Sequence, residues 1–142
     1  MAVAFVIKYK NDCQIIADQL DVPVENILGL AAQESQYGVG RIAKEFNNYF
    51  SMHAPAPFQI GTGVPLGNAN IRIAKFSSFL QSAQSFLIRY GNAVRSKKDP
   101  LAFAQALVNI GFNTGNAANG GRAGFVNYLV GIIMAVKGRL SC

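Results

Sequence analysis

Residues 30–38 have the sequence Leu30-Ala31-Ala32-Gln33-Glu34-Ser35-Gln36-Tyr37-Gly38, and residues 41–50 continue as Arg41-Ile42-Ala43-Lys44-Glu45-Phe46-Asn47-Asn48-Tyr49-Phe50. The first stretch predicts the end of an apolar helix that carries one carboxylate and stops at a glycine. The second predicts a short helical turn followed by polar and aromatic residues. Together they predict an acid beside a cleft, whose walls the rest of the chain must supply.

The acid in question is Glu34. On a helical wheel of residues 24–37, drawn at roughly 100° per residue, Glu34 falls inside the apolar arc between Leu30 and Ile27. Loss of water at such a position favours the neutral carboxyl and raises its pKa. A glutamate of raised pKa can protonate a leaving oxygen near neutral pH. The alternative is a glutamate at the helix edge whose side chain swings into solvent.

Length and composition predict one mainly α-helical domain over residues 1–142. Hydrophobic residues make up 51% of the 142 and charged residues 14%, which is typical of a chain with a substantial core. Apolar spacing, caps and breakers predict helices over 3–20, 24–37, 41–46, 77–91, 99–110 and 123–137, the last of them apolar nearly all round. Prolines and glycines punctuate a loop-rich lobe over 47–74, with short strands expected at 58–60 and 71–73.

The net charge indicates which classes of binding partner the protein favours. Thirteen Lys and Arg against seven Asp and Glu give a net charge of +6, which favours a polyanionic partner such as a cell wall, or is simply the charge of a basic domain. The basic residues are scattered except in residues 95–98, so we expect no nucleic-acid partner. No apolar run approaches the roughly 20 residues of a membrane span. Residues 2–7 lack a basic leader, so we expect delivery by a route other than Sec, or as a mature form.

No second catalytic group is evident. No Asp or Glu occurs between Phe46 and Lys98, so a glycosidase-like carboxylate pair is not visible. A water held by polar groups such as Asn48, Ser51, His53 or Asn113 is one substitute. His53 is the one histidine, and we expect it to be a hydrogen-bonding residue of the lobe.

The two cysteines, Cys13 and Cys142, do not have the spacing of a metal site, so we expect neither a metal nor a cofactor. A disulfide between them and two free thiols both fit the sequence.

These motifs resemble glycoside hydrolase family 73, the lysozyme-like peptidoglycan N-acetylglucosaminidases. The resemblance rests on Val22-Pro23 at a helix entry, Ala31-Ala32-Gln33-Glu34-Ser35 through Gly38, Arg41-Ile42-Ala43, and Asn47-Asn48-Tyr49-Phe50-Ser51-Met52, where the family pattern is Asn-Asn-Leu-Phe-Gly-Ile. Residues 79–90, 103–112 and 125–133 resemble later family segments. The resemblance implies a lysozyme-like helical fold with a small β-hairpin lobe. It also implies that Glu34 is the catalytic acid and that Asn48, Tyr49, Phe112 and Asn113 line the substrate site. We add His53 to the expected substrate-binding residues as a polar side chain of the lobe.

One departure concerns the mechanism. Where the family has a Tyr-Ala-Thr-Asp-Pro-like motif, this chain has Phe112-Asn113-Thr114-Gly115-Asn116, which lacks the aspartate.

The resemblance implies a peptidoglycan glycan-strand hydrolase that acts in the periplasm or cell wall of a target cell. The expected partners are the glycan strand and, for an effector injected by a type VI secretion system, an immunity protein that occludes the cleft. A lytic transglycosylase and a phage endolysin are the enzymatic alternatives. A basic wall-binding module without activity is the third.

Overall fold

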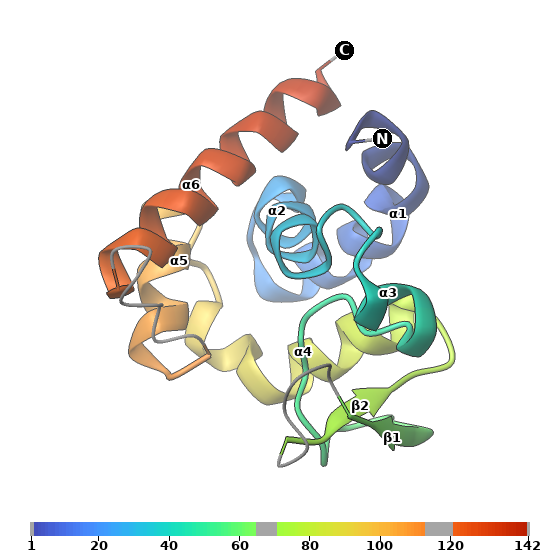
Figure 1. Ribbon diagram of the computed structural model, residues 1–142. Helices are drawn as coiled ribbons and strands as arrows, with labels where there is room; N and C mark the ends of the chain where they lie inside the picture. Colours follow the sequence, from blue (N-terminus) through green and yellow to red (C-terminus); the bar gives the residue numbers. More distant parts are fainter. Residues whose placement is uncertain (1, 65–70, 113–120, 142) are drawn as a thin grey trace.

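The central element of the fold is helix α2 (Val24–Ser35), as a computed structural model of the chain shows; the model describes residues 2–64, 71–112 and 121–141. Eight of the twelve residues of α2 are buried. The helix packs mainly against α6 (Gly121–Leu140) and α1 (Ala2–Leu20), and lies in the middle of the molecule (Figure 1). Because α2 carries Glu34 near its end, the core of the protein holds the candidate acid in place.

The remaining helices enclose α2. Helix α4 (Phe79–Val94) packs against α1, and α5 (Pro100–Asn109) joins α4 to α6 (Figure 1). The predicted starts are confirmed: the Ser78 side chain accepts from the Gln81 amide, and the Asp99 side chain accepts from the Ala102 amide. The expected fold class, a mainly α lysozyme-like domain, is also confirmed.

Two glycines mark close approaches between helices. Gly91 is not the predicted stop of α4, which continues to Val94; a Cβ at Gly91 would lie 3.0 Å from a methyl group of Leu20. A Cβ at Gly29 would lie 2.6 Å from Cγ1 of Ile133 and 3.0 Å from its Cα. Both glycines therefore serve to bring helices together.

Helix α6 differs from the expectation in two ways. A helix that is apolar nearly all round is expected to be the most buried one, but only five of its twenty residues are buried, and Tyr128 and Met134 are exposed. By length and composition alone α6 could cross a membrane, because its mean hydropathy is 1.3 over a window of which 28% is buried. The sequence had predicted no membrane-spanning segment. Core helices of globular proteins can have the same length and apolar composition. Helix α6 packs against α2 and α5, as a core helix does.

The lobe lies beside the end of α2. Helix α3 (Arg41–Phe46) leads into it, and it is built around an antiparallel pair of strands, β1 (Gly61–Gly63) and β2 (Ile73–Lys75), in which Thr62 lies opposite Ala74 (Figure 1). The predicted hairpin exists, but its strands lie two to three residues later than predicted. The apolar Phe58 and Ile60 that suggested a strand are exposed. Glycine is needed in β1 because a Cβ at Gly63 would lie 2.2 Å from the ring of Phe46.

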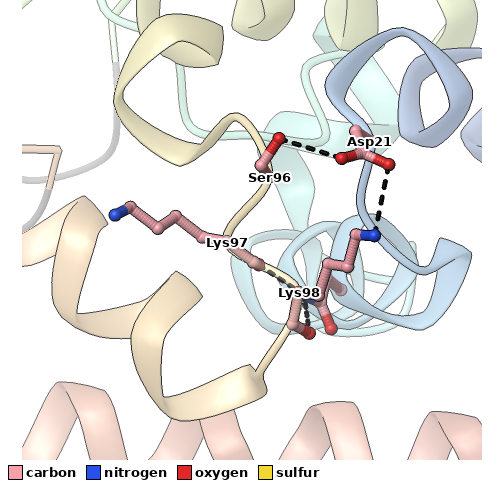
Figure 2. A network of polar contacts seen from close by, with 5 residues as sticks. Asp21, Ser96, Lys97 and Lys98 are labelled. Atoms are coloured by element: carbon pink, nitrogen blue, oxygen red, sulfur yellow. Dashed lines mark hydrogen bonds and ion pairs between the residues drawn. The ribbon is translucent and has the colours of Figure 1, made fainter.

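The turn between α1 and α2 is fastened to the connection between α4 and α5 (Figure 2). Ser96 donates to the Asp21 carboxylate at 2.9 Å, and the Lys98 ammonium lies 3.5 Å from the same group. The Ser96 hydrogen bond, followed by the charge of Lys98, holds the pKa of Asp21 below its usual value. Beneath these exposed groups, the fully buried Asn26 amide donates to the carbonyl oxygens of Lys97 and Lys98 at 3.3 and 3.1 Å. The start of α2 is thus anchored to the connection between α4 and α5.

We expect Asn26→Ala to lower the free energy of unfolding by about 1–2 kcal/mol, because both carbonyl groups lose a buried donor. Urea unfolding followed by circular dichroism would measure this loss. Ser96→Ala is the control, because it removes an exposed hydrogen bond of the same network and should cost about 0.5 kcal/mol or less. Equal losses in the two variants would mean that the buried amide does not anchor the turn.

Candidate active site

Glu34 lies one residue before the end of α2, and the chain turns sharply after it. The buried Ser35 hydroxyl donates to the Ala31 carbonyl at 2.6 Å and accepts from the Gly38 amide at 3.0 Å. Gln36 adopts a left-handed conformation and caps the helix in place of the predicted Gly38, which is also left-handed. The serine that follows the glutamate therefore holds the turn, and the turn fixes where the Glu34 side chain leaves the helix.

The environment of Glu34 favours its neutral form. The residue is half-buried, and burial raises the pKa of its carboxyl from 4.5 to about 7, even though hydrogen bonds from Ser51 and Gln33 act in the opposite direction. The predicted rise in pKa is thereby confirmed. At neutral pH the group is close to half protonated, so it can deliver a proton and then exist as a carboxylate. That is the property required of a general acid.

Gln33 is a neighbour that the sequence did not indicate. Adjacent positions on a helix point in different directions, so helical periodicity does not bring Gln33 to Glu34. A hydrogen bond from the Gln33 side chain nevertheless lowers the pKa of the Glu34 carboxyl. Its Oε1 is buried and has no hydrogen-bond partner among the described residues.

The loop after α3 brings polar groups up to Glu34. The Ser51 hydroxyl lies 3.4 Å from the Glu34 carbonyl oxygen. The Asn48 amide donates to the carbonyl oxygens of Met52 and Ala74 at 2.9 and 2.8 Å, and its Oδ1 accepts from the Met52 amide at 2.9 Å. Asn48 is only 1% exposed. Contact of this side chain with a sugar would require the loop to open, whereas its part in shaping the loop is direct.

Tyr49 and Phe50 point into the protein. The Tyr49 hydroxyl lies 3.1 Å from that of Tyr9 on α1, and burial raises the pKa of Tyr49 to about 12. Phe50 is fully buried and stacks on Phe86 of α4 with ring centroids 5.3 Å apart. The two aromatic residues thus fasten the loop to α1 and α4.

Three predicted site residues lie further along the chain. The His53 side chain is exposed, while its backbone pairs with Ile73 and its carbonyl accepts from Arg89 at 3.0 Å. The half-buried Phe112 packs edge-to-face against Tyr90, with ring centroids 5.0 Å apart. Asn113 lies outside the described residues. The assignment of Asn48, Tyr49, His53, Phe112 and Asn113 to the substrate stays a prediction.

Glu34 stands apart from the other acids of the chain. Of the seven Asp and Glu, the remaining six are Asp12, Asp18, Asp21, Glu25, Glu45 and Asp99. Glu45 pairs with Arg41 at 2.5 Å on the surface, and Asp99 caps α5. Segments 65–70 and 113–120 contain no acid at all. A mechanism that needs two facing carboxylates therefore has no evident second member.

Cys13 and one surface cavity lie away from Glu34. Cys13 is a fully buried free thiol in the core, and burial raises its pKa well above the usual value; Cys142 lies outside the described residues. A cavity of about 420 Å³ lies at the opposite end of α2, with Lys10, Glu25 and Lys137 in its lining. Glu34 is not among the residues that line this cavity.

Comparison with solved structures supplies the context for this geometry. The chain is 64% identical to a chain in a type VI secretion system effector–immunity complex from Pseudomonas protegens, with a TM-score of 0.89, and the match covers 99% of this chain and 94% of that one. A peptidoglycan hydrolase from Sphingomonas sp. A1 matches at 23% identity and a TM-score of 0.80, covering 98% and 93% of the two chains.

A third structure has the same fold. The glycoside hydrolase domain of FlgJ from Salmonella typhimurium matches at 20% identity and a TM-score of 0.75, covering 99% and 91% of the two chains. No protein-family model matches the sequence, and no curated protein matches it.

Proposed function

Because this chain belongs to the type VI secretion system effectors that have the fold of glycoside hydrolase family 73, we propose that it cleaves the glycan strand of peptidoglycan in the wall of a target bacterium. Its fold is that of peptidoglycan hydrolases, and its net charge of +6 suits an anionic wall polymer. Within the producing cell, an immunity protein would bind over the Glu34 site and block it. The Pseudomonas protegens complex supports such a partner.

The environment of Glu34 is the observation that carries the proposal. In glycoside hydrolysis a carboxylic acid protonates the leaving oxygen while the C1–O bond breaks through an oxocarbenium-like state. Glu34 is half-buried at a fixed helix end, and burial raises its pKa to about 7. Its proton is therefore available at the neutral pH of the periplasm, and we assign it the role of general acid.

The second half of the reaction needs a nucleophile that attacks the sugar C1. With no second carboxylate evident, the substrate's own N-acetyl oxygen can attack C1, and water then opens the resulting ring with the Glu34 carboxylate as base. The same absence favours a second candidate, a lytic transglycosylase. In that reaction the C6 hydroxyl of the sugar attacks its own C1 and leaves a 1,6-anhydro end.

Product analysis separates these reactions. Purified sacculi digested with the protein should release soluble fragments whose new ends are reducing N-acetylglucosamine, as detected by mass spectrometry before and after borohydride reduction. Fragments with 1,6-anhydro ends would identify a lytic transglycosylase. Binding to sacculi without release of any fragment would contradict the enzymatic proposal and favour a wall-binding module.

A further inference from the structure

Ser51 has an unusual backbone conformation for a residue with a side chain. Its φ is +54°, in the left-handed region that glycine occupies readily and that other residues mostly avoid. Such conformations persist where the surrounding structure determines them, and they gather at functional sites. The serine side chain is therefore expected to contribute something at this position that glycine would not.

The neighbours of Ser51 fix its position. Asn48 closes the turn by bonding both the amide and the carbonyl of Met52. Phe50, the residue before Ser51, is fully buried against Phe86. The residues on both sides of Ser51 are therefore held in place, and the Ser51 hydroxyl reaches the carbonyl oxygen of Glu34 near the end of α2.

The hydroxyl of Ser51 is linked to Glu34 in two ways. It lies 3.4 Å from the main-chain carbonyl oxygen of Glu34 and donates to it. A hydrogen bond from the same side chain also lowers the pKa of the Glu34 carboxyl. A serine hydroxyl has only one proton to donate, so it bonds one acceptor at a time.

We propose that Ser51 is a positioning residue that donates its hydrogen bond to the Glu34 carboxylate left behind when the proton passes to the glycosidic oxygen. While Glu34 is protonated, the hydroxyl donates to the Glu34 carbonyl. When the proton leaves, the hydroxyl turns to the new carboxylate, and Ser51 keeps its own proton throughout. Hydrogen bonds to a charged acceptor are stronger than those between neutral groups, so the exchange stabilises the product of proton transfer.

This inference rests on the proposed function of Glu34 as the acid. Among the described residues, the pKa of Glu34 responds to burial, to Ser51 and to Gln33, and no charged side chain contributes a resolved shift. Removal of the Ser51 hydroxyl should therefore act on Glu34 without the complication of a neighbouring charge.

Two variants and a matched pair test the inference. Ser51→Gly removes the hydroxyl and relieves the backbone, whereas Ser51→Ala removes the hydroxyl and leaves the backbone conformation disfavoured. The controls are Ser96→Gly and Ser96→Ala. Ser96 is also a left-handed serine, with φ of +61°, and it donates to a carboxylate at 2.9 Å, but that carboxylate is Asp21 at the far side of the fold.

The first readout is the pH profile of fragment release from sacculi. Both Ser51 variants should move the alkaline limb of the profile upward by about one pH unit, because the carboxylate loses a donor, and should lower kcat with little change in KM. The Ser96 pair should leave the profile unchanged. A shift in neither Ser51 variant would overturn the inference, and so would an equal shift in the Ser96 pair.

The second readout does not depend on activity. Nuclear magnetic resonance titration of the ¹³C-labelled Glu34 carboxyl should show the same upward shift of its pKa in both Ser51 variants. If the wild type releases no fragments, the proposed function fails, while this titration still decides whether Ser51 acts on Glu34. If the wild type is active and the titration is unchanged, the inference alone fails.

Discussion

Glu34→Gln is expected to abolish fragment release from sacculi and, at the same time, to make the protein more stable at alkaline pH. Loss of a general acid lowers the rate by about a hundredfold to ten-thousandfold, because glutamine has no proton to give to the leaving oxygen. The gain in stability comes from the same property that suits Glu34 to catalysis. Its carboxyl is held where a negative charge is poorly solvated.

The sign of the stability effect follows from the raised pKa. The folded protein binds the Glu34 proton more tightly than the unfolded chain does, with a pKa of about 7 against an ordinary value of 4.5. Below pH 4.5 both states are protonated and the carboxyl carries no penalty. As the pH rises from 4.5 through 7, the folded state loses stability relative to the unfolded state, by up to about 3 kcal/mol at pH 8. Glutamine does not ionise and escapes this loss.

Urea unfolding of the wild type and Glu34→Gln at pH 4 and pH 8 measures the difference. The two proteins should unfold at similar urea concentrations at pH 4 and diverge at pH 8. Glu25→Gln is the control, since it makes the same chemical change in the first turn of the same helix. That variant should retain activity and show no gain at pH 8. Unchanged lysis by Glu34→Gln would remove Glu34 from the mechanism, and equal stability at pH 8 would mean that its carboxylate is well solvated.

The sequence predicted the helices and the partly buried position of Glu34 because both depend on local, periodic signals. The helix of Glu34 has an apolar arc, a proline before its start and an acid within the arc, and each of these is visible in the chain. Ser78 and Asp99 have the side chains that cap helices. The fold and the placement of Glu34 followed from such signals.

What the sequence could not predict depends on contacts between distant segments. Gly91 has the local signature of a helix stop, yet α4 continues to Val94, and the missing side chain leaves room for Leu20 of α1. Gly63 likewise leaves room for the ring of Phe46. The side chains of Asn48 and Tyr49 hold the loop that carries Ser51, a role that the sequence did not indicate. A single sequence does not reveal which partner a polar side chain will find across the fold.

The second large effect is expected at Gly29, where α2 and α6 approach most closely. We expect Gly29→Ala to lower the free energy of unfolding by about 2 kcal/mol, even though alanine favours a helix over glycine by about 1 kcal/mol. A Cβ at this position would lie 2.6 Å from Cγ1 of Ile133 and 3.0 Å from its Cα. A rotation of the Ile133 side chain relieves the first contact only. The second involves backbone, so the two helices must move apart.

Gly131→Ala on α6 is the matched control, because a Cβ there meets nothing within 4 Å. This variant should gain about 0.5–1 kcal/mol from helix propensity alone, so the two alanine variants should differ by about 3 kcal/mol with opposite signs. Urea unfolding at pH 4, where Glu34 is neutral, measures the pair without interference from that group. If both variants were stabilised, the space between α2 and α6 would be larger than the structure indicates.

Since α2 carries Glu34, a displaced helix in Gly29→Ala should also lower the rate of fragment release in the fraction that remains folded. Gly131→Ala should match the wild type.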